Sequence, residues 1–156
     1  MALNGQPLTI WLVEDNPAHA ILAQQALQHH PRYRDSRIFT DAESAWRALQ
    51  SADKSPDLLL LDLSLPGMGG LQLLERLRED ERWADLPVAI LTCSQADDDI
   101  VRALAQPFST YVGKPLTAAR LETVLRTIDH FGVALLGDPL PPATASSVPE
   151  ALQEAP

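Results

Sequence analysis

The chain has 156 residues, 46% of them hydrophobic, and a formal net charge of −9. This length and composition are typical of one globular domain with a single hydrophobic core. The acidic balance and the lack of a basic cluster argue against a nucleic-acid partner, because such binding depends on grouped lysines and arginines. No apolar run is long enough to span a bilayer, and the start resembles no signal peptide, so we expect a cytoplasmic protein without a membrane contact.

Two residue types are rare enough in the sequence to be informative. The one cysteine, Cys93, can form neither an internal disulfide nor a thiolate metal site by itself, and we expect it to be buried as a small apolar side chain. Of the 12 basic residues, only Lys54 and Lys114 are lysines. Because arginine supplies nearly all of the positive charge, Lys114 is a candidate for a role specific to lysine.

The chain begins with a short apolar run, Leu8–Val13, which predicts a strand. The acidic pair Glu14-Asp15 follows, and Asn16 and Pro17 then favour the start of a helix that continues over residues 18–30. Three histidines of this helix are expected to be solvated: His19, His29 and His30.

A weaker strand is predicted over residues 37–40, and Asp41 is the expected cap of a helix over residues 42–50. The strongest strand signal comes next, where four consecutive leucines precede Asp62. Central parallel strands are covered on both faces and therefore read as continuous apolar runs. Pro66-Gly67 forces a turn soon afterwards, so Asp62 should lie at the carboxyl end of the strand, where open α/β sheets bind ligands.

The second half of the chain repeats the alternation of strand and helix. The expected elements are a helix over residues 71–78, a strand over 88–92, a helix that Pro107 stops, a strand over 109–113 and a helix over 117–136. Thr92 ends the fourth strand, and Lys114 follows the fifth. Ser94 is the expected cap of the fourth helix, and we explain Asp97, Asp98 and Asp99 near its start by helix capping and solvation rather than by a cation site.

Five strand-then-helix units predict an α/β fold, in which a doubly wound, five-stranded parallel sheet has helices on both faces. We expect residues 1–136 to form this one domain. Residues 137–156 contain five prolines and too few apolar residues for a core. This segment is therefore predicted to be a disordered tail.

The carboxyl ends of parallel strands meet at one edge of the sheet, which should bring together Glu14, Asp15, Asp62, Thr92 and Lys114. Crowded carboxylates repel one another unless a cation neutralises them. Mg²⁺ prefers carboxylate oxygens and water, whereas Zn²⁺ would need His or Cys ligands that this set lacks. A carboxylate can also attack a phosphoryl group if a metal ion, a lysine and a hydroxyl stabilise the charge. The pattern predicts Mg²⁺-dependent phosphoryl chemistry.

Five motifs in order resemble the receiver domain of two-component response regulators: Glu14-Asp15, Asp62, Thr92, Tyr111 and Lys114-Pro115. The resemblance covers about residues 8–134, and the chain is most similar to single-domain regulators paired with bacterial phytochromes. It implies a flavodoxin-like strand order of 2-1-3-4-5. It also implies a phosphorelay in which a histidine kinase supplies the phosphoryl group to a signalling module, with no enzymatic activity beyond self-catalysed phosphorylation and dephosphorylation.

The resemblance further implies roles for single residues. Asp62 would be the phosphoacceptor, Lys114 would contact the phosphoryl group, and Thr92 and Tyr111 would form a switch pair. The Mg²⁺ ligands would be Asp15 and Asp62 directly, Glu14 through water, and the backbone carbonyl of Ser64.

Two departures from the family pattern accompany these matches. Ser64 stands where many receivers have asparagine, which affects the expected lifetime of the phosphoryl group. Gln106-Pro107-Phe108 replaces the usual Gly-Ala, and the restriction on a residue before proline should alter that loop.

Two other functions stay open at this point. A Mg²⁺-dependent phosphohydrolase with an aspartyl nucleophile would need a second acid/base carboxylate close after that nucleophile, and Ser64 occupies the position two residues after Asp62. A flavodoxin-like cofactor binder would need a phosphate-binding loop in place of Glu14-Asp15.

The final helix carries an apolar stripe at helical spacing: Leu121, Val124, Leu125, Ile128, Phe131, Gly132 and Leu135. Its length corresponds to roughly 30 Å, against roughly 17 to 20 Å for a typical strand, so its last turns should extend past the sheet. Phe131, Val133, Leu135 and Leu136 would then be exposed. This pattern predicts a homodimer through the fourth and fifth helices, the fifth strand and the helix extension.

Overall fold

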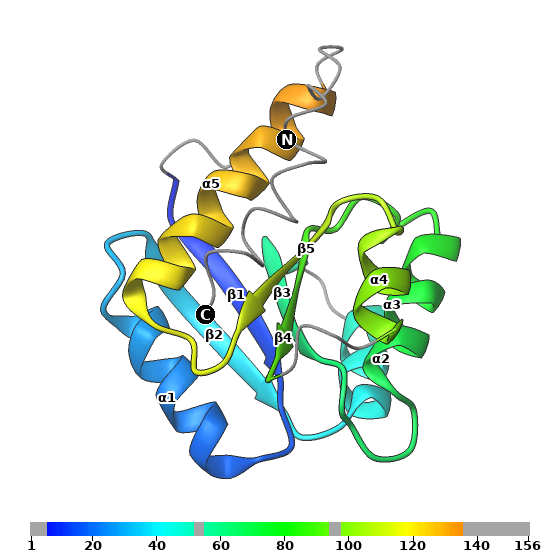
Figure 1. The fold of residues 1–156 in the computed structure, drawn as a ribbon. Helices are drawn as coiled ribbons and strands as arrows, with labels where there is room; N and C mark the ends of the chain where they lie inside the picture. The colour runs from blue at the N-terminus through cyan, green and yellow to red at the C-terminus, as the bar shows by residue number, and fades with distance from the viewer. Residues whose placement is uncertain (1–5, 52–54, 94–97, 136–156) are drawn as a thin grey trace.

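The computed structural model describes residues 6–51, 55–93 and 98–135. Five parallel strands form one sheet in the order β2-β1-β3-β4-β5, which confirms the predicted order (Figure 1). The strands are β1 (Leu8–Val13), β2 (Tyr33–Phe39), β3 (Leu58–Asp62), β4 (Val88–Thr92) and β5 (Ser109–Gly113). The helices are α1 (Pro17–Gln28), α2 (Ala42–Ser51), α3 (Gly70–Glu79), α4 (Asp98–Leu104) and α5 (Ala118–Leu135).

Two helical layers cover the sheet, with α1 and α5 on one face and α2, α3 and α4 on the other (Figure 1). Each face has its own hydrophobic core. Alternate β1 residues such as Leu12 pack with α1 and α5, whereas Trp11 and Val13 pack with α2 and α3. The predicted doubly wound fold is therefore confirmed.

Strand β3 explains why this chain has four leucines in a row. Leu58 and Leu60 belong to the core under α1 and α5, while Leu59 and Leu61 belong to the opposite core. Every position of the strand is buried, up to and including Asp62. The apolar run therefore leads directly to a carboxylate at the carboxyl edge of the sheet.

The edge strand β2 is longer than predicted. It extends over Tyr33–Phe39 rather than residues 37–40, and most of its side chains are exposed or half-buried. Among the described residues, it pairs with one strand, β1. A strand that packs on one neighbour needs few apolar residues, so its polar first half gave no strand signal.

The structure corrects three predictions of burial. Cys93 is exposed, because it follows the last residue of β4 where the chain leaves the sheet. His30 lies beyond the end of α1 and is half-buried. Its Nε2 is 2.9 Å from Oε1 of Glu122 on α5. His19 is also half-buried and is described with the site below. Of the three histidines expected to be solvated, His29 is the one that is exposed.

Several predicted features lie wholly or partly outside the described residues. Ser94 lies outside the described residues, as do Leu136 and the tail over residues 137–156. The side chains of residues 131–135 are also outside the described part of the chain. The tail and the dimer therefore stay predictions. Among the described residues, no helix combines the length and the apolar character needed to cross a bilayer.

The altered loop before β5 is held by a half-buried arginine, Arg78, to which no sequence pattern pointed. Phe108 has a φ of 57°, in the left-handed region that residues other than glycine rarely adopt. Arg78, at the end of α3, donates hydrogen bonds to the carbonyls of Pro107 at 2.7 Å, Trp83 at 3.1 Å and Phe108 at 3.1 Å. Burial lowers the pKa of Arg78 to about 10, so the guanidinium stays charged at neutral pH.

We expect Arg78→Met to destabilise the fold by about 3 kcal/mol, because it leaves several carbonyls without their charged donor while keeping the aliphatic stem. Urea unfolding followed by circular dichroism would measure the change. Arg76→Met is the matched control, since Arg76 lies on the same helix, is exposed and stacks over Trp46 at 5.7 Å. Equal stability of the two variants would contradict the role of Arg78.

Candidate functional site

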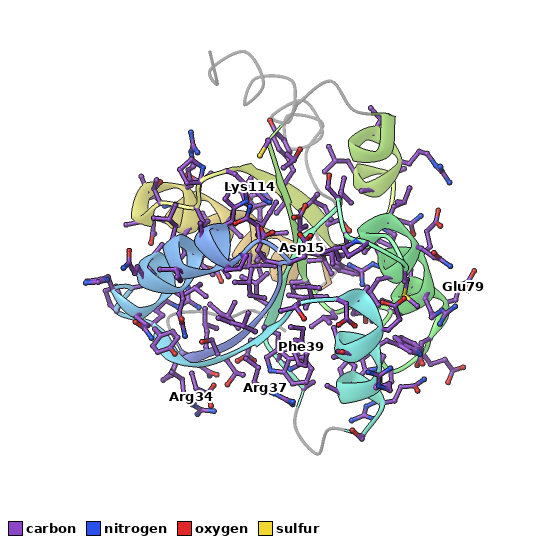
Figure 2. The ribbon with its side chains drawn as sticks, turned by 90° about the horizontal axis from the view of Figure 1, so that it is seen from below. Asp15, Arg34, Arg37, Phe39, Glu79 and Lys114 are labelled. Atoms are coloured by element: carbon purple, nitrogen blue, oxygen red, sulfur yellow. The ribbon has the colours of Figure 1, made fainter. Side chains whose placement is uncertain are left out.

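The ends of four strands bring polar side chains to one edge of the sheet. Leu61 is in register with Val13, so Glu14 and Asp15 leave β1 beside the end of β3, where Asp62 lies. Figure 2 shows Asp15 and Lys114 near each other in the middle of the view, away from Glu79 at the periphery. Glu14-Asp15, Asp62 and Lys114, which come from three separate places in the sequence, therefore occupy one site.

The ammonium of Lys114 is the centre of this site. Its Nζ lies 2.8 Å from Oδ2 of Asp62 and 2.7 Å from Oε1 of Glu14. It also lies 3.2 Å from Nδ1 of His19. The side chains of Lys114, Asp62 and Glu14 are 10%, 5% and 1% exposed. One buried cation thus faces two buried carboxylates, so one negative charge of the pair stays uncompensated.

The three charged groups shift one another's pKa values. Burial raises the pKa of Asp62, but hydrogen bonds from Lys114, Glu14 and the Ser64 backbone outweigh this and hold it below its ordinary value. Burial lowers the pKa of Lys114, and the two carboxylates more than reverse that effect. Burial and the neighbouring Asp62 raise the pKa of Glu14 despite the contact with Lys114. Asp62 is therefore the carboxylate that ionises more readily.

The loop after β3 is shaped to present the Asp62 carboxylate. The backbone N–H of Ser64 donates to Oδ1 of Asp62 at 2.9 Å. Helix α3 then begins at Gly70 against the end of the strand, where a Cβ atom would overlap the carbonyl oxygen of Asp62. Glu43 of α2 accepts a hydrogen bond from the backbone N–H of Met68 at 2.9 Å, which ties the middle of the loop to the neighbouring helix.

The acidic residues have the arrangement of a cation site. Glu14, Asp15 and Asp62 each offer one carboxylate oxygen, and these atoms lie within 4.8 Å of one another. Oε1 of Glu14 is buried and, within the described part of the chain, accepts no hydrogen bond of normal geometry, although the ammonium of Lys114 is close. An all-oxygen set with an unsatisfied buried oxygen fits a hard divalent cation such as Mg²⁺.

The remaining predicted residues are Thr92, Tyr111 and Ser64. Thr92 is buried at the end of β4, and its carbonyl accepts the backbone N–H of Lys114 at 2.8 Å. Tyr111 is half-buried on β5, paired in register with Ile90, and packs against the core under α2 and α3. Ser64 is exposed in the turn after Asp62. The switch role of Thr92 and Tyr111 and the ligand role of the Ser64 carbonyl stay predictions.

A model of the response regulator receiver domain matches residues 10–126 of this chain. The chain belongs to the response regulator receiver family. The match begins within β1 and ends half-way along α5, so it includes every residue of the site described above.

Known receivers resemble this one in sequence and in fold. The probable methanogenesis regulatory protein FilR2 of Methanothrix harundinacea is 34% identical over 84% of this chain and 85% of its own length. Other curated regulators are longer, and this receiver spans 59% and 65% of the length of two of them.

Three solved structures illustrate the likeness in fold. The bacteriophytochrome response regulator AtBRR is 26% identical, with a TM-score of 0.70 over 78% of this chain and 91% of that one. The phosphorylated cyanobacterial phytochrome response regulator RcpA is 29% identical, with a TM-score of 0.67 over 80% and 93%. The receiver domain of the sensor histidine kinase PA1611 from Pseudomonas aeruginosa PAO1, with a magnesium ion coordinated in its active site cleft, is 26% identical, with a TM-score of 0.68 over 79% and 98%.

His19 is the site residue of this receiver that sequence reasoning missed. Pro17 is the first residue of α1, so His19 lies in its first turn, close to the acidic pair at the end of β1. Its Nδ1 is 3.9 Å from Oε1 of Glu14 as well as close to Lys114. The position of Pro17 was a usable signal, because the first turn of a helix that follows such a strand must lie at the sheet edge.

Proposed function

We propose that this receiver accepts a phosphoryl group from a histidine kinase on Asp62, in a Mg²⁺-dependent two-component phosphorelay in the cytoplasm. One observation carries the proposal. Asp62 is a buried carboxylate whose pKa is lowered and whose Oδ2 lies 2.8 Å from the ammonium of Lys114. The nucleophile is therefore ionised at neutral pH and lies beside the cation that a phosphoryl oxygen needs.

The proposed transfer uses groups that already lie in place. One carboxylate oxygen of Asp62 attacks phosphorus, the bond from phosphorus to the kinase imidazole nitrogen breaks, and that nitrogen takes the electron pair. Lys114 then donates to a phosphoryl oxygen, and Thr92 at the end of β4 offers a hydroxyl on the neighbouring strand. The product is an acyl phosphate on Asp62.

We infer that Asp15 and Asp62 bind Mg²⁺ directly, with Glu14 acting through water and Ser64 through its carbonyl. The ion would neutralise the carboxylates and the phosphoryl charge. The all-oxygen cluster supports this inference, and so does the magnesium ion in the related PA1611 receiver domain.

Asp15→Asn should weaken Mg²⁺ binding at least about tenfold, because Asp15 is the exposed member of the cluster and loses a full charge. A Mg²⁺ titration followed by tryptophan fluorescence would measure it, since Trp11 lies three residues before Glu14 on β1. Glu79→Gln is the control, because this carboxylate is far from the site (Figure 2). Equal affinities of the two variants would refute the ligand role.

We further propose that the cognate kinase is linked to a phytochrome, on the strength of the likeness to AtBRR and RcpA. Phosphotransfer profiling tests this proposal together with the function. Each autophosphorylated histidine kinase of the organism would be mixed with the receiver and Mg²⁺. Fast transfer of label from a phytochrome-linked kinase is expected. Fast transfer from a different kinase would reject the phytochrome link, and transfer from none would reject the receiver function itself.

A signalling receiver and a phosphohydrolase differ in how fast the acyl phosphate is hydrolysed after the transfer. Ser64 stands two residues after Asp62, where a hydrolase of this type would need an acid/base carboxylate, and its N–H is bonded to Asp62. We therefore propose that hydrolysis is limited to slow self-catalysed loss of the phosphoryl group. Rapid turnover of a phosphate monoester such as p-nitrophenyl phosphate would contradict this proposal.

We also propose a homodimer through α4, β5 and α5. Val101 on α4 supports it, because this apolar side chain is 69% exposed. Val101→Glu should weaken the dimer at least about tenfold in light scattering over a concentration series. Ile21→Glu is the matched control, since Ile21 is 56% exposed on α1, across the molecule from α4 (Figure 1). A native chain that is monomeric at tens of micromolar would refute the dimer.

A further inference from the structure

We propose that His19 is a positioning residue for Lys114, whose ammonium it holds against Asp62 through a hydrogen bond accepted at Nδ1. This inference rests on the proposed function, because it assigns the third contact of the lysine that is to meet the phosphoryl group. It adds to the site a residue that none of the predicted motifs contains.

The geometry gives the ammonium three partners from three elements. Glu14 follows β1, Asp62 ends β3, and His19 lies in the first turn of α1. Their contact atoms are 2.7, 2.8 and 3.2 Å from Nζ of Lys114. A lysine ammonium carries three N–H donors and no acceptor. The imidazole must therefore present an unprotonated Nδ1 to it and carry its hydrogen on Nε2.

The three partners differ in what phosphorylation does to them. Asp62 changes from a carboxylate into an acyl phosphate, so the oxygen that pairs with Lys114 loses its charge and the phosphoryl oxygens take over. His19 is not itself modified by the transfer, so its Nδ1 can accept from the ammonium before and after it. It can thus hold the ammonium in place without competing for its charge as a third carboxylate would.

A hydrogen bond that fixes the ammonium is useful to a lysine because its side chain is long and flexible. Its stem has several rotatable bonds, and holding them in one arrangement for the transfer costs conformational entropy. Oε1 of Glu14 is close to the ammonium but lacks hydrogen-bond geometry. Within the described residues, the well-formed hydrogen bonds of Nζ are therefore those to Asp62 and His19.

Initial rates of adduct formation from a small phosphodonor with Mg²⁺ test the inference. His19→Leu should slow the reaction about fivefold, whereas His19→Asn, whose Oδ1 can accept in place of Nδ1, should stay within about twofold of the native rate. In a Lys114→Ala background, His19→Leu should cause no further loss. An equal loss in both backgrounds, or no loss in the native one, would overturn the inference.

A second measurement is independent of phosphorylation. The sequence has only two lysines, so ¹⁵N-lysine labelling limits the possible ammonium resonances to those of Lys114 and Lys54. Slow proton exchange should make the Lys114 ammonium visible in the native protein and in His19→Asn, and exchange broadening should remove it in His19→Leu. If the native protein forms no adduct, the proposed function fails, while this resonance still decides the contact. An ammonium signal that His19→Leu leaves unchanged would overturn the inference.

Discussion

Asp62→Asn should reduce the phosphoryl adduct formed from a small phosphodonor and Mg²⁺ at least about 100-fold. The amide that replaces the carboxylate is a poor nucleophile, since its nitrogen lone pair is delocalised and its oxygen carries no full charge. The fold should survive, because asparagine has nearly the same shape and its Oδ1 can still accept the Ser64 N–H. Intact mass spectrometry measures the adduct directly.

Asp57→Asn is the matched control for this change. Asp57 lies just before the opposite end of the same strand, where its Oδ2 accepts the backbone N–H of Thr9 at 2.8 Å. An asparagine can accept the same hydrogen bond, so this variant should form the adduct at the native rate. A full adduct on Asp62→Asn would refute the assignment of the phosphoacceptor.

Lys114→Ala should slow adduct formation by about 100-fold, because one preorganised donor to the developing phosphoryl charge is lost. Mg²⁺ affinity should be unchanged or higher in this variant. The ammonium now sits between Glu14 and Asp62, and its removal leaves both carboxylates without their cation. A slower rate of adduct formation without a loss of Mg²⁺ affinity is the result expected for a lysine that contacts the phosphoryl group.

The same tryptophan-fluorescence titration and initial-rate assay measure both quantities for Lys114→Ala. Lys54→Ala serves as the control, because it removes the other lysine of the chain. A Lys114 variant that loses Mg²⁺ affinity in parallel with its rate would show that the lysine supports the metal site instead.

The architecture could be predicted because each strand end carries its own signal. The four leucines of β3 fit a strand covered on both faces, and the polar residues at the carboxyl ends of β1, β3, β4 and β5 had to meet at one edge once the strands were parallel. The polar edge strand β2 was underestimated, because pairing with one neighbour leaves little periodic pattern in its sequence.

The errors concern side chains whose surroundings come from distant parts of the chain. His30 is half-buried because Glu122 of α5 lies beside it, and His19 because Lys114 does. Arg78 holds the loop at Pro107 and Phe108, from 29 and 30 residues away in the sequence. Local pattern contains no information on such neighbours, so these contacts needed the structure.

The most direct test of the account is to locate the phosphoryl group on the native chain. The receiver would be incubated with a small phosphodonor and Mg²⁺, treated with borohydride, digested and examined by peptide mass spectrometry. Borohydride reduces an acyl phosphate to the alcohol, so a phosphorylated aspartate becomes homoserine. Homoserine is expected at position 62 and at no other aspartate. Homoserine at position 15 instead, or an adduct that resists reduction because it lies on a histidine, would contradict this expectation.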